Sequence, residues 1–171
     1  MTRRLLLLLR HAKSSWDDVG LADHDRPLAL RGHQAVEKLR GRLAADGTVP
    51  DLVLCSTARR AVETWQGIAP TFPAGTPVEL SAELYGATAG ELCERLRRVP
   101  AAAESVLVIA HNPGLEDLAL DLIDSGDLDL RQQLATKFPT GALATLLVPT
   151  AWTELAWGTA ELSTYVVPAE L

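Results

Sequence analysis

The amino-acid sequence predicts a three-layer α/β/α fold with a mostly parallel central sheet. Short apolar runs that suit strands buried on both faces alternate with segments of helical periodicity, and this alternation is typical of parallel sheets covered by helices. The chain has 171 residues, of which 47% are hydrophobic, enough for an ordinary hydrophobic core. No stretch rich in proline, glycine or serine divides it, so we expect one domain over residues 1–171.

The first quarter of the chain contains an expected strand, a loop and a helix. Residues 5–9 are all leucine and end at a charged residue, which predicts a buried strand. Residues 14–27 are polar and contain four aspartates, so we expect a loop there. Over residues 31–46 the apolar side chains recur at helical spacing until Gly47 stops the pattern.

The middle of the chain repeats the alternation of strand and helix. Residues 51–55 form a second apolar run, and residues 57–68 have helical composition. We expect a third strand at residues 78–80 and a short helix over residues 90–99. The sequence SVLVIA at residues 105–110 is the clearest strand pattern of the chain.

The last third begins with a helix and ends with extended segments. Pro113 suits the first turn of a helix whose apolar residues continue to Ile123. Residues 142–148 and 153–158 read as strands separated by a short turn, and the tail to Leu171 as another extended piece. We expect these segments to join the same sheet, antiparallel at an edge.

The charge and the cysteines exclude several classes of protein. Sixteen lysines and arginines against 22 acidic residues give a formal net charge of −6, whereas nucleic-acid and membrane-surface proteins depend on concentrated positive charge. The leucine run is too short for a signal peptide or a spanning helix. Cys55 and Cys93 are too few and too far apart for a disulfide framework. We expect a cytoplasmic protein with buried thiols, and a monomer by default.

Polar residues that suit an anion follow three of the expected strands. They are Arg10, His11, Lys13 and Ser14 after the first strand, Ser56, Arg59 and Arg60 after the second, and His111 and Asn112 after the fourth. Ligands of open α/β sheets bind beyond the carboxyl ends of the strands, where these residues would meet. The sequence therefore predicts an anion site, and phosphate is the anion that it favours.

Other chemistries fit these residues less well. A Cys-x5-Arg phosphate loop would need an arginine six residues after Cys55, and that position is Ala61. The P-loop and the glycine-rich dinucleotide motif are absent from the sequence. The histidines lack metal-ligand spacing, so we expect no metal and no other cofactor. The aspartates of residues 14–27 leave a metal site open as an alternative.

The remaining histidines and two of the tryptophans are interpreted as structural. His24, in the polar loop, and His33, among charged residues of a helix, are typical of solvated surface. Trp65 and Trp157 are predicted in the core. Trp16 is predicted at the rim of the anion site.

Four motifs occur in order between residues 9 and 112. They are Leu9-Arg10-His11-Ala12-Lys13-Ser14, Arg26-Pro27-Leu28 with Gly32-x-Gln34-Ala35, Ser56-x3-Arg60-Ala61-x2-Thr64, and Ala110-His111-Asn112. Together they resemble the histidine phosphatase superfamily, also called the phosphoglycerate mutase-like family, and within it the small phosphohistidine phosphatases of the SixA type. Ala12 stands where this family usually has glycine, which a negative φ would tolerate.

The resemblance implies a phosphatase that first transfers the phosphoryl group to its own histidine. The residues implied in catalysis are His11 as nucleophile, Arg10, Arg60 and His111 as ligands of the phosphate oxygens, and Glu83 as the acid for the leaving group. The residues implied in substrate binding are Lys13, Ser14 and Asn112.

Three functions remain open on the sequence. The first is a metal-independent phosphatase of phosphohistidine in proteins, favoured because the short connections predict an open pocket. The second is a phosphatase of small phosphate monoesters such as sugar phosphates or nucleotides. The third is a phosphate-binding or phosphoprotein-binding module without turnover.

Overall fold

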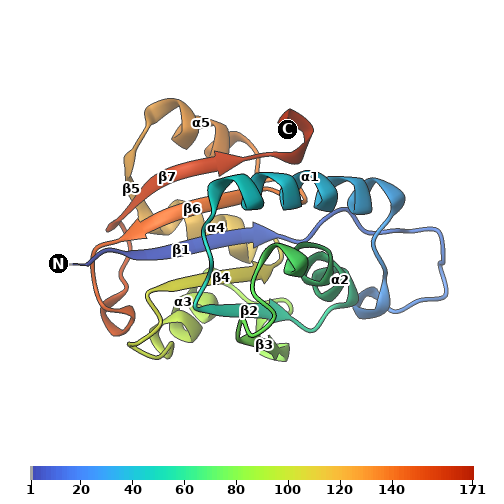
Figure 1. Cartoon of the computed structure of the whole chain (residues 1–171), viewed down its shortest axis with the longest axis horizontal. Coiled ribbons are helices and arrows are strands. Elements are labelled where there is room, and N and C mark those ends of the chain that lie inside the picture. Colours follow the sequence, from blue (N-terminus) through green and yellow to red (C-terminus); the bar gives the residue numbers. More distant parts are fainter. Residues whose placement is uncertain (1) are drawn as a thin grey trace.

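The computed structural model describes residues 2–171, which form a seven-stranded sheet (Figure 1). The strands are β1 (Arg4–Arg10), β2 (Leu52–Ser56), β3 (Val78–Ser81), β4 (Ser105–Ala110), β5 (Ile123–Gly126), β6 (Leu143–Val148) and β7 (Ala160–Val166). Their order across the sheet is β3-β2-β4-β1-β6-β7-β5. Within these residues β6 alone runs against the other six strands, so the sheet is mostly parallel.

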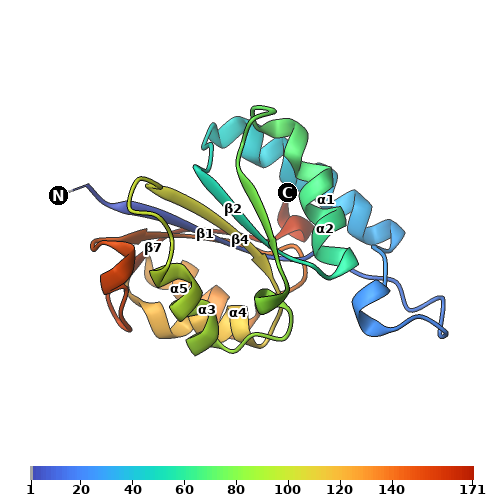
Figure 2. The same ribbon diagram turned by 90° about the horizontal axis from the view of Figure 1, so that it is seen from below.

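Helices cover both faces of the sheet, and the predicted three-layer α/β/α class is confirmed. Figure 2 shows α1 and α2 on one side of the strands and α3, α4 and α5 on the other. The helices are α1 (Leu30–Asp46), α2 (Arg59–Ile68), α3 (Ala89–Arg97), α4 (Gly114–Leu122) and α5 (Leu128–Thr136). None of the helices within residues 2–171 has both the length and the apolar character needed to cross a membrane.

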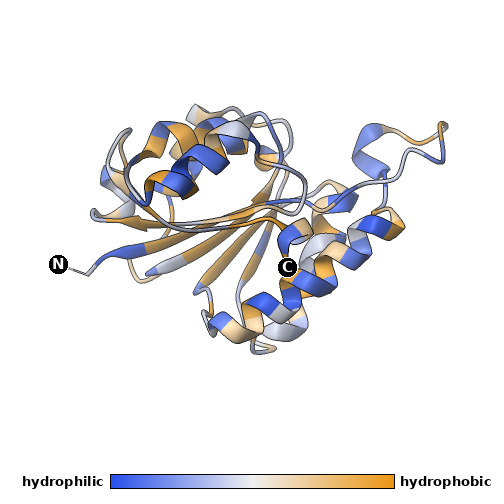
Figure 3. Ribbon diagram, turned by 90° about the horizontal axis from the view of Figure 1, so that it is seen from above, coloured by the Kyte–Doolittle hydropathy of each residue, from blue (hydrophilic) through white to orange (hydrophobic). Residues whose placement is uncertain are grey.

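The leucine run of β1 supplies both hydrophobic cores. Successive side chains of a strand point to opposite faces, so Leu6 and Leu8 pack with α3, α4 and α5, whereas Leu7 and Leu9 pack with α1 and α2. These four leucines are almost completely buried. Figure 3 shows the same division, with apolar strands inside and polar faces of the helices outside. The central position of β1 thus explains why its sequence is apolar throughout.

The structure corrects the prediction for the last third of the chain. The antiparallel strand β6 lies between β1 and β7 rather than at an edge. Residues 153–158 are not a strand, because a 3₁₀ helix (Trp152–Glu154) and a turn occupy this segment. Ile123 begins β5 instead of ending a helix, and the prediction missed both β5 and α5. Short polar elements such as β5, Ile-Asp-Ser-Gly, lack the apolar pattern on which the prediction depended.

The polar loop of residues 14–27 connects β1 to α1 and extends beyond the sheet (Figure 3). It contains the 3₁₀ helix η1 (Asp23–Asp25). Its two ends are held together because Ser14 and Leu28 form an isolated antiparallel bridge. A Cβ atom on Gly32 would lie only 2.2 Å from the carbonyl oxygen of Lys13, so glycine at this position lets α1 pack directly against the chain after β1.

Candidate active site

Two histidines follow neighbouring parallel strands at matching positions. β1 pairs with β4 so that Arg10 lies opposite Ala110, and His11 and His111 are the next residues. The centroids of the two imidazole rings are 5.0 Å apart, and both side chains are buried. β2 pairs with the other edge of β4 and ends at Ser56. The three strand ends that the sequence singled out therefore meet.

Two hydrogen bonds fix the tautomer of His11. Its Nδ1 lies 2.7 Å from the carbonyl oxygen of Ala12, and because a carbonyl can only accept, Nδ1 carries the proton. Arg60 Nε donates to His11 Nε2 over 3.3 Å, so this nitrogen carries no proton and its lone pair accepts the hydrogen bond. His11 thus presents an unprotonated Nε2 inside the site.

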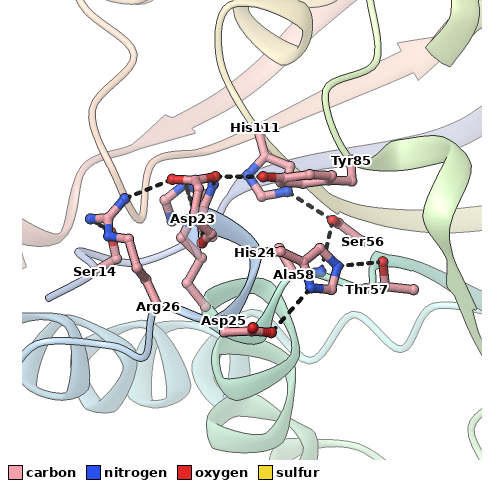
Figure 4. Close-up of polar contacts among 12 residues, drawn as sticks. Ser14, Asp23, His24, Asp25, Arg26, Ser56, Thr57, Ala58, Tyr85 and His111 are labelled. Atoms are coloured by element: carbon pink, nitrogen blue, oxygen red, sulfur yellow. Dashed lines mark hydrogen bonds and ion pairs between the residues drawn. The ribbon is translucent and has the colours of Figure 1, made fainter. Parts of the chain in front are cut away.

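His111 is held by the end of β2. Ser56 Oγ accepts a hydrogen bond of 3.2 Å from the backbone N–H of Ala58 and forms a second hydrogen bond, of 2.8 Å, with His111 Nε2 (Figure 4). Within residues 2–171 His111 Nδ1 is buried and has no hydrogen-bond partner. A buried polar atom without a partner is rare in folded proteins, so this nitrogen is a candidate contact for a ligand.

Asp23 in the loop of residues 14–27 organises the guanidinium of Arg60. Arg60 Nη1 donates to the Asp23 carbonyl oxygen over 2.7 Å, and Nη2 donates to Asp23 Oδ2 over 3.0 Å. The Tyr85 hydroxyl donates to Oδ2 over 2.6 Å, and Arg26 Nη1 donates to Oδ1 over 3.0 Å (Figure 4). These hydrogen bonds, that of Tyr85 foremost, hold the pKa of Asp23 well below its usual range. Asp23 is therefore ionised, and Arg60 is left with Nε directed at His11.

The Ser-x3-Arg-Ala-x2-Thr motif has a structural explanation. Thr64 Oγ1 donates to the Arg60 carbonyl over 2.7 Å and accepts from the Ala12 backbone N–H over 3.0 Å. One buried hydroxyl therefore connects the first turn of α2 to the residue after His11. Ala12 itself is buried, and no residue other than glycine in the described chain has a positive φ, so the methyl group in place of glycine is accommodated.

Arg10 and Asn112 share one acceptor. Arg10 Nη1 and Asn112 Nδ2 both donate to the carbonyl oxygen of Phe138, at 3.0 and 2.9 Å. Arg10 Nε is buried without a partner in the described part of the chain. This unpaired N–H leaves Arg10 with a donor for an anion.

The other residues predicted to bind substrate lie differently. Ser14 is buried, and its Oγ accepts from Arg26 Nη2 over 2.6 Å. Lys13 is exposed and lines a cleft beside the site. Neither contacts His11, so the structure brings together Arg10, His11, Arg60 and His111, with Asn112 beside them.

The structure does not place Glu83 with these residues. Its side chain is 57% exposed, and Oε2 accepts from Arg98 Nη2 over 2.8 Å and lies 3.8 Å from Arg95 Nε. Glu83 is therefore part of an ion-pair cluster with two arginines from the end of α3. Tyr85, two residues later, is the side chain of this segment that reaches the site, with its ring 5.5 Å from that of His111.

Two structural interpretations of aromatic residues were wrong. His24 is half-buried rather than freely solvated, because its Nε2 lies 2.9 Å from Thr57 Oγ1 and its ring packs edge-on against Tyr85. Trp157 lies in a turn and is 49% exposed instead of buried in a core strand. Trp16 is exposed, with the Arg26 guanidinium 3.2 Å from its ring centroid.

The titratable groups at the strand ends are adapted to the buried environment. Burial lowers the pKa of His11 to about 3 and that of His111 to about 4, with the positive charge of Arg60 adding to both effects. Both rings are thus neutral near pH 7. Burial raises the pKa of the Cys55 thiol to about 12, so this cysteine is protonated and inert.

In the part of the chain that the structure describes, no group of three or more His, Cys, Asp or Glu side chains is arranged to hold a metal ion.

These shifts predict that stability falls in mild acid. In the unfolded chain a histidine binds its proton near pH 6.5, whereas folded His11 and His111 bind theirs only near pH 3 and 4, so protonation favours unfolding below pH 6.5. The free energy of unfolding should fall by about 2.7 kcal/mol per pH unit below 6.5, about half from each ring. Urea unfolding at pH 7, 6 and 5 measures this slope. His11→Asn and His111→Asn should each halve it, and His33→Asn, on the exposed face of α1, should not; an unchanged slope in the double variant would contradict the assignment.

Comparison with known proteins agrees with this geometry. The model of the histidine phosphatase superfamily (branch 1) matches residues 6–106, and the chain therefore belongs to that superfamily. It is 39% identical over 162 residues to an uncharacterised protein of Mycobacterium tuberculosis, covering 94% of this chain and 99% of that protein.

Two solved structures define the branch. A candidate phosphohistidine phosphatase SixA from Nakamurella multipartitia is 30% identical with a TM-score of 0.85, covering 98% of both chains. A candidate SixA phosphatase from Agrobacterium tumefaciens is 29% identical with a TM-score of 0.81, covering 96% of this chain and 98% of that one. The chain is thus a phosphatase of the SixA type.

Proposed function

We propose that this phosphatase removes the phosphoryl group from phosphohistidine in proteins, through a covalent intermediate on His11 and without a metal ion. The nucleophile follows from the fixed tautomer. Because Ala12 holds the proton on Nδ1, the lone pair of His11 Nε2 is available at neutral pH. The lowered pKa of His11 keeps this nitrogen unprotonated throughout the physiological range.

Three side chains near His11 can bind the phosphoryl oxygens. Arg60 and Arg10 remain charged, and guanidinium groups match the geometry of phosphate oxygens. His111 Nδ1 and Arg10 Nε are buried without partners in residues 2–171. In the tautomer in which Ser56 donates to His111 Nε2, both of these nitrogens can donate to phosphate oxygens. Phosphoryl transfer depends mainly on such positioning and charge stabilisation.

The reaction balances in two steps. The lone pair of His11 Nε2 forms a bond to phosphorus while the P–N bond of the substrate breaks, and its electron pair goes to the substrate imidazole. Water then attacks phosphorus, the P–Nε2 bond breaks, and inorganic phosphate leaves. Because His11 keeps its proton on Nδ1, it departs in the second step as a neutral ring.

The choice of substrate depends on the carboxyl groups near the site. A serine or sugar alkoxide needs a proton from an acid in order to leave, whereas a phosphohistidine ring protonated at its second nitrogen leaves as neutral imidazole. Asp23 is held ionised by Tyr85, Arg26 and Arg60, and Glu83 is paired with arginines of α3. Neither of these two carboxyls is in place to act as the acid, and a third, Glu116, accepts from Asn112 Nδ2 over 3.4 Å. These interactions favour a phosphoramidate over an ester.

The proposal treats residues 1–171 as one catalytic domain that works as a monomer in the cytoplasm. A single domain is supported because both hydrophobic cores pack against the same sheet. A reducing compartment is supported because Cys55 and Cys93 are free and buried. The phosphohistidine phosphatase names of the two SixA structures also support the substrate class.

The proposal predicts a strong preference for phosphohistidine. In EDTA, kcat/KM on a histidine-phosphorylated protein should exceed that on phosphoserine peptides, sugar phosphates and nucleotides by on the order of 10²-fold or more, because ester cleavage lacks an acid. Phosphate release is measured against the spontaneous hydrolysis of each substrate without enzyme. Faster turnover of a small ester would replace the proposal by the monoester phosphatase, and stable phosphate binding without release would replace it by the binding module.

A further inference from the structure

A large cleft lies beside the candidate active site and contains all three lysines of the chain. It has a volume of about 1530 Å³ and lies between α1, α5 and the carboxyl-terminal segment of residues 165–170. Lys13, Lys38 and Lys137 line it, together with Arg10 and Arg31, and the sequence contains no other lysine. This concentration of positive charge occurs in a chain whose net charge is −6.

The cations of the cleft differ from most arginines elsewhere in their partners. Among residues 2–171, none of the five cleft cations lies within 4.0 Å of a carboxylate oxygen. The acidic residues that line the cleft are Glu37, Asp129 and Glu170, three against five basic residues. Elsewhere eight arginines form ion pairs: Arg3, Arg26, Arg42, Arg59, Arg60, Arg95, Arg97 and Arg98. The cleft therefore presents positive charge that the protein itself leaves unpaired, and this charge is complementary to an anionic ligand.

The cleft adjoins the candidate active site through two residues close to His11 in the sequence. Arg10 lines the cleft and directly precedes His11, and its charge acts on both His11 and His111. Lys13 follows two residues after His11. The cleft thus begins at residues that flank the nucleophile in the sequence.

The size and the lining of the cleft favour a peptide over a small molecule. Pockets for small ligands have volumes of about 300–1,000 Å³, which this cleft exceeds. Gln34, Gln132 and Gln133 are exposed along it, and amide side chains can donate to and accept from a peptide backbone. The Tyr165 hydroxyl donates to the carbonyl oxygen of Lys137, which fixes the backbone that carries this lysine.

We propose that this cleft binds an acidic segment next to the phosphohistidine of the substrate protein. The inference rests on the proposed function and adds to it: His11 and its neighbours recognise the phosphoryl group, and the lysine-lined cleft selects which phosphoproteins are dephosphorylated. Acidic side chains of the substrate pair with Lys38 and Lys137, and glutamine amides bind its backbone.

The test compares two double variants that carry the same change of charge on the same two helical regions. Lys38→Glu with Lys137→Glu reverses charge in the cleft. Arg40→Glu with Arg131→Glu reverses it on α1 and α5 at positions that do not line the cleft. The probes are phosphohistidine peptides flanked by aspartate and glutamate, the same peptides flanked by lysine, and phosphoramidate as a minimal substrate.

The cleft variant should lose about tenfold or more in kcat/KM on the acidic peptide, through KM, and gain on the lysine-flanked peptide. Its activity on phosphoramidate should equal that of the wild type, and the control variant should match the wild type on all three probes. Equal losses in both double variants, or a loss on phosphoramidate as well, would overturn the cleft as a peptide site. If the cleft variant lowers kcat/KM only on a small substrate with two phosphates, the cleft binds a small anion and the inference is wrong.

Failure of the proposed function is distinguishable from failure of this inference. If wild-type enzyme hydrolyses neither phosphoramidate nor any phosphohistidine peptide, the proposed function fails. If it hydrolyses both and the cleft variant behaves like the wild type on the acidic peptide, only the role of the cleft fails.

Discussion

His11→Ala is expected to lower phosphate release from a histidine-phosphorylated protein by on the order of 10⁴-fold or more, in the presence of EDTA. The variant lacks the Nε2 lone pair that forms the covalent intermediate, and the free cysteines of the chain are buried and protonated, so they cannot replace it. Wild-type enzyme quenched during turnover should carry one phosphoryl group that is stable in alkali and lost in acid, as a phosphoimidazole is. The variant should carry none.

The matched control is His33→Ala, which removes an imidazole from the exposed face of α1 and should change neither quantity. His111→Ala separates the two buried rings. It should slow formation of the phosphoenzyme, because a donor to the phosphoryl oxygens is lost, yet still allow labelling at His11. If His11→Ala carries a phosphoryl group and His111→Ala does not, His111 is the nucleophile instead of His11. Equal turnover by His11→Ala and the wild type would refute covalent catalysis by His11.

The site could be predicted from the sequence as far as it depends on strand ends. A buried parallel strand is recognisable from its apolar run, and the residue after each run lies at the same edge of the sheet. His11, Ser56 and His111 follow three such runs, and in the structure they are adjacent because β1, β4 and β2 are neighbours. The apolar pattern of the strands was thus sufficient to predict both the fold class and the residues at the centre of the site.

What the sequence did not reveal depends on contacts between a loop and the sheet. Asp23 is one of four aspartates in residues 14–27, and nothing in its local sequence separates it from the others. Its role appears only when η1 places it against Arg60 and Tyr85. Glu83 illustrates the reverse case, since it occupies the expected segment but is drawn to arginines that follow it on α3. The proximity of Asp129, Lys137 and α1 around the cleft likewise depends on α5, which the sequence pattern did not predict.

Arg60→Lys is expected to lower kcat/KM on a phosphohistidine protein by about 10²–10³-fold, although the charge is retained. Arg60 uses its fork for separate tasks: Nη1 and Nη2 bind Asp23, and Nε faces His11 Nε2. A lysine ammonium has no planar fork, so it cannot bind Asp23 and donate to His11 Nε2 at the same time. The loss should fall mainly on kcat, because the donor acts on charge that develops as phosphorus is transferred. Arg59→Lys, at the exposed position that precedes Arg60 on α2, is the control and should leave kcat/KM unchanged.

The partnership with Asp23 makes a sharper prediction. Asp23 does not contact His11 in the structure, so we infer that it acts by positioning Arg60. Asp23→Asn should lower kcat by about tenfold, since a neutral amide holds the guanidinium less firmly. In the Arg60→Lys background the same change should have little further effect, because the group that Asp23 positions is already gone. A double-mutant cycle on kcat measures this coupling. If the two losses multiply instead, Asp23 acts on the substrate directly rather than through Arg60, and the loop of residues 14–27 contributes a binding group of its own.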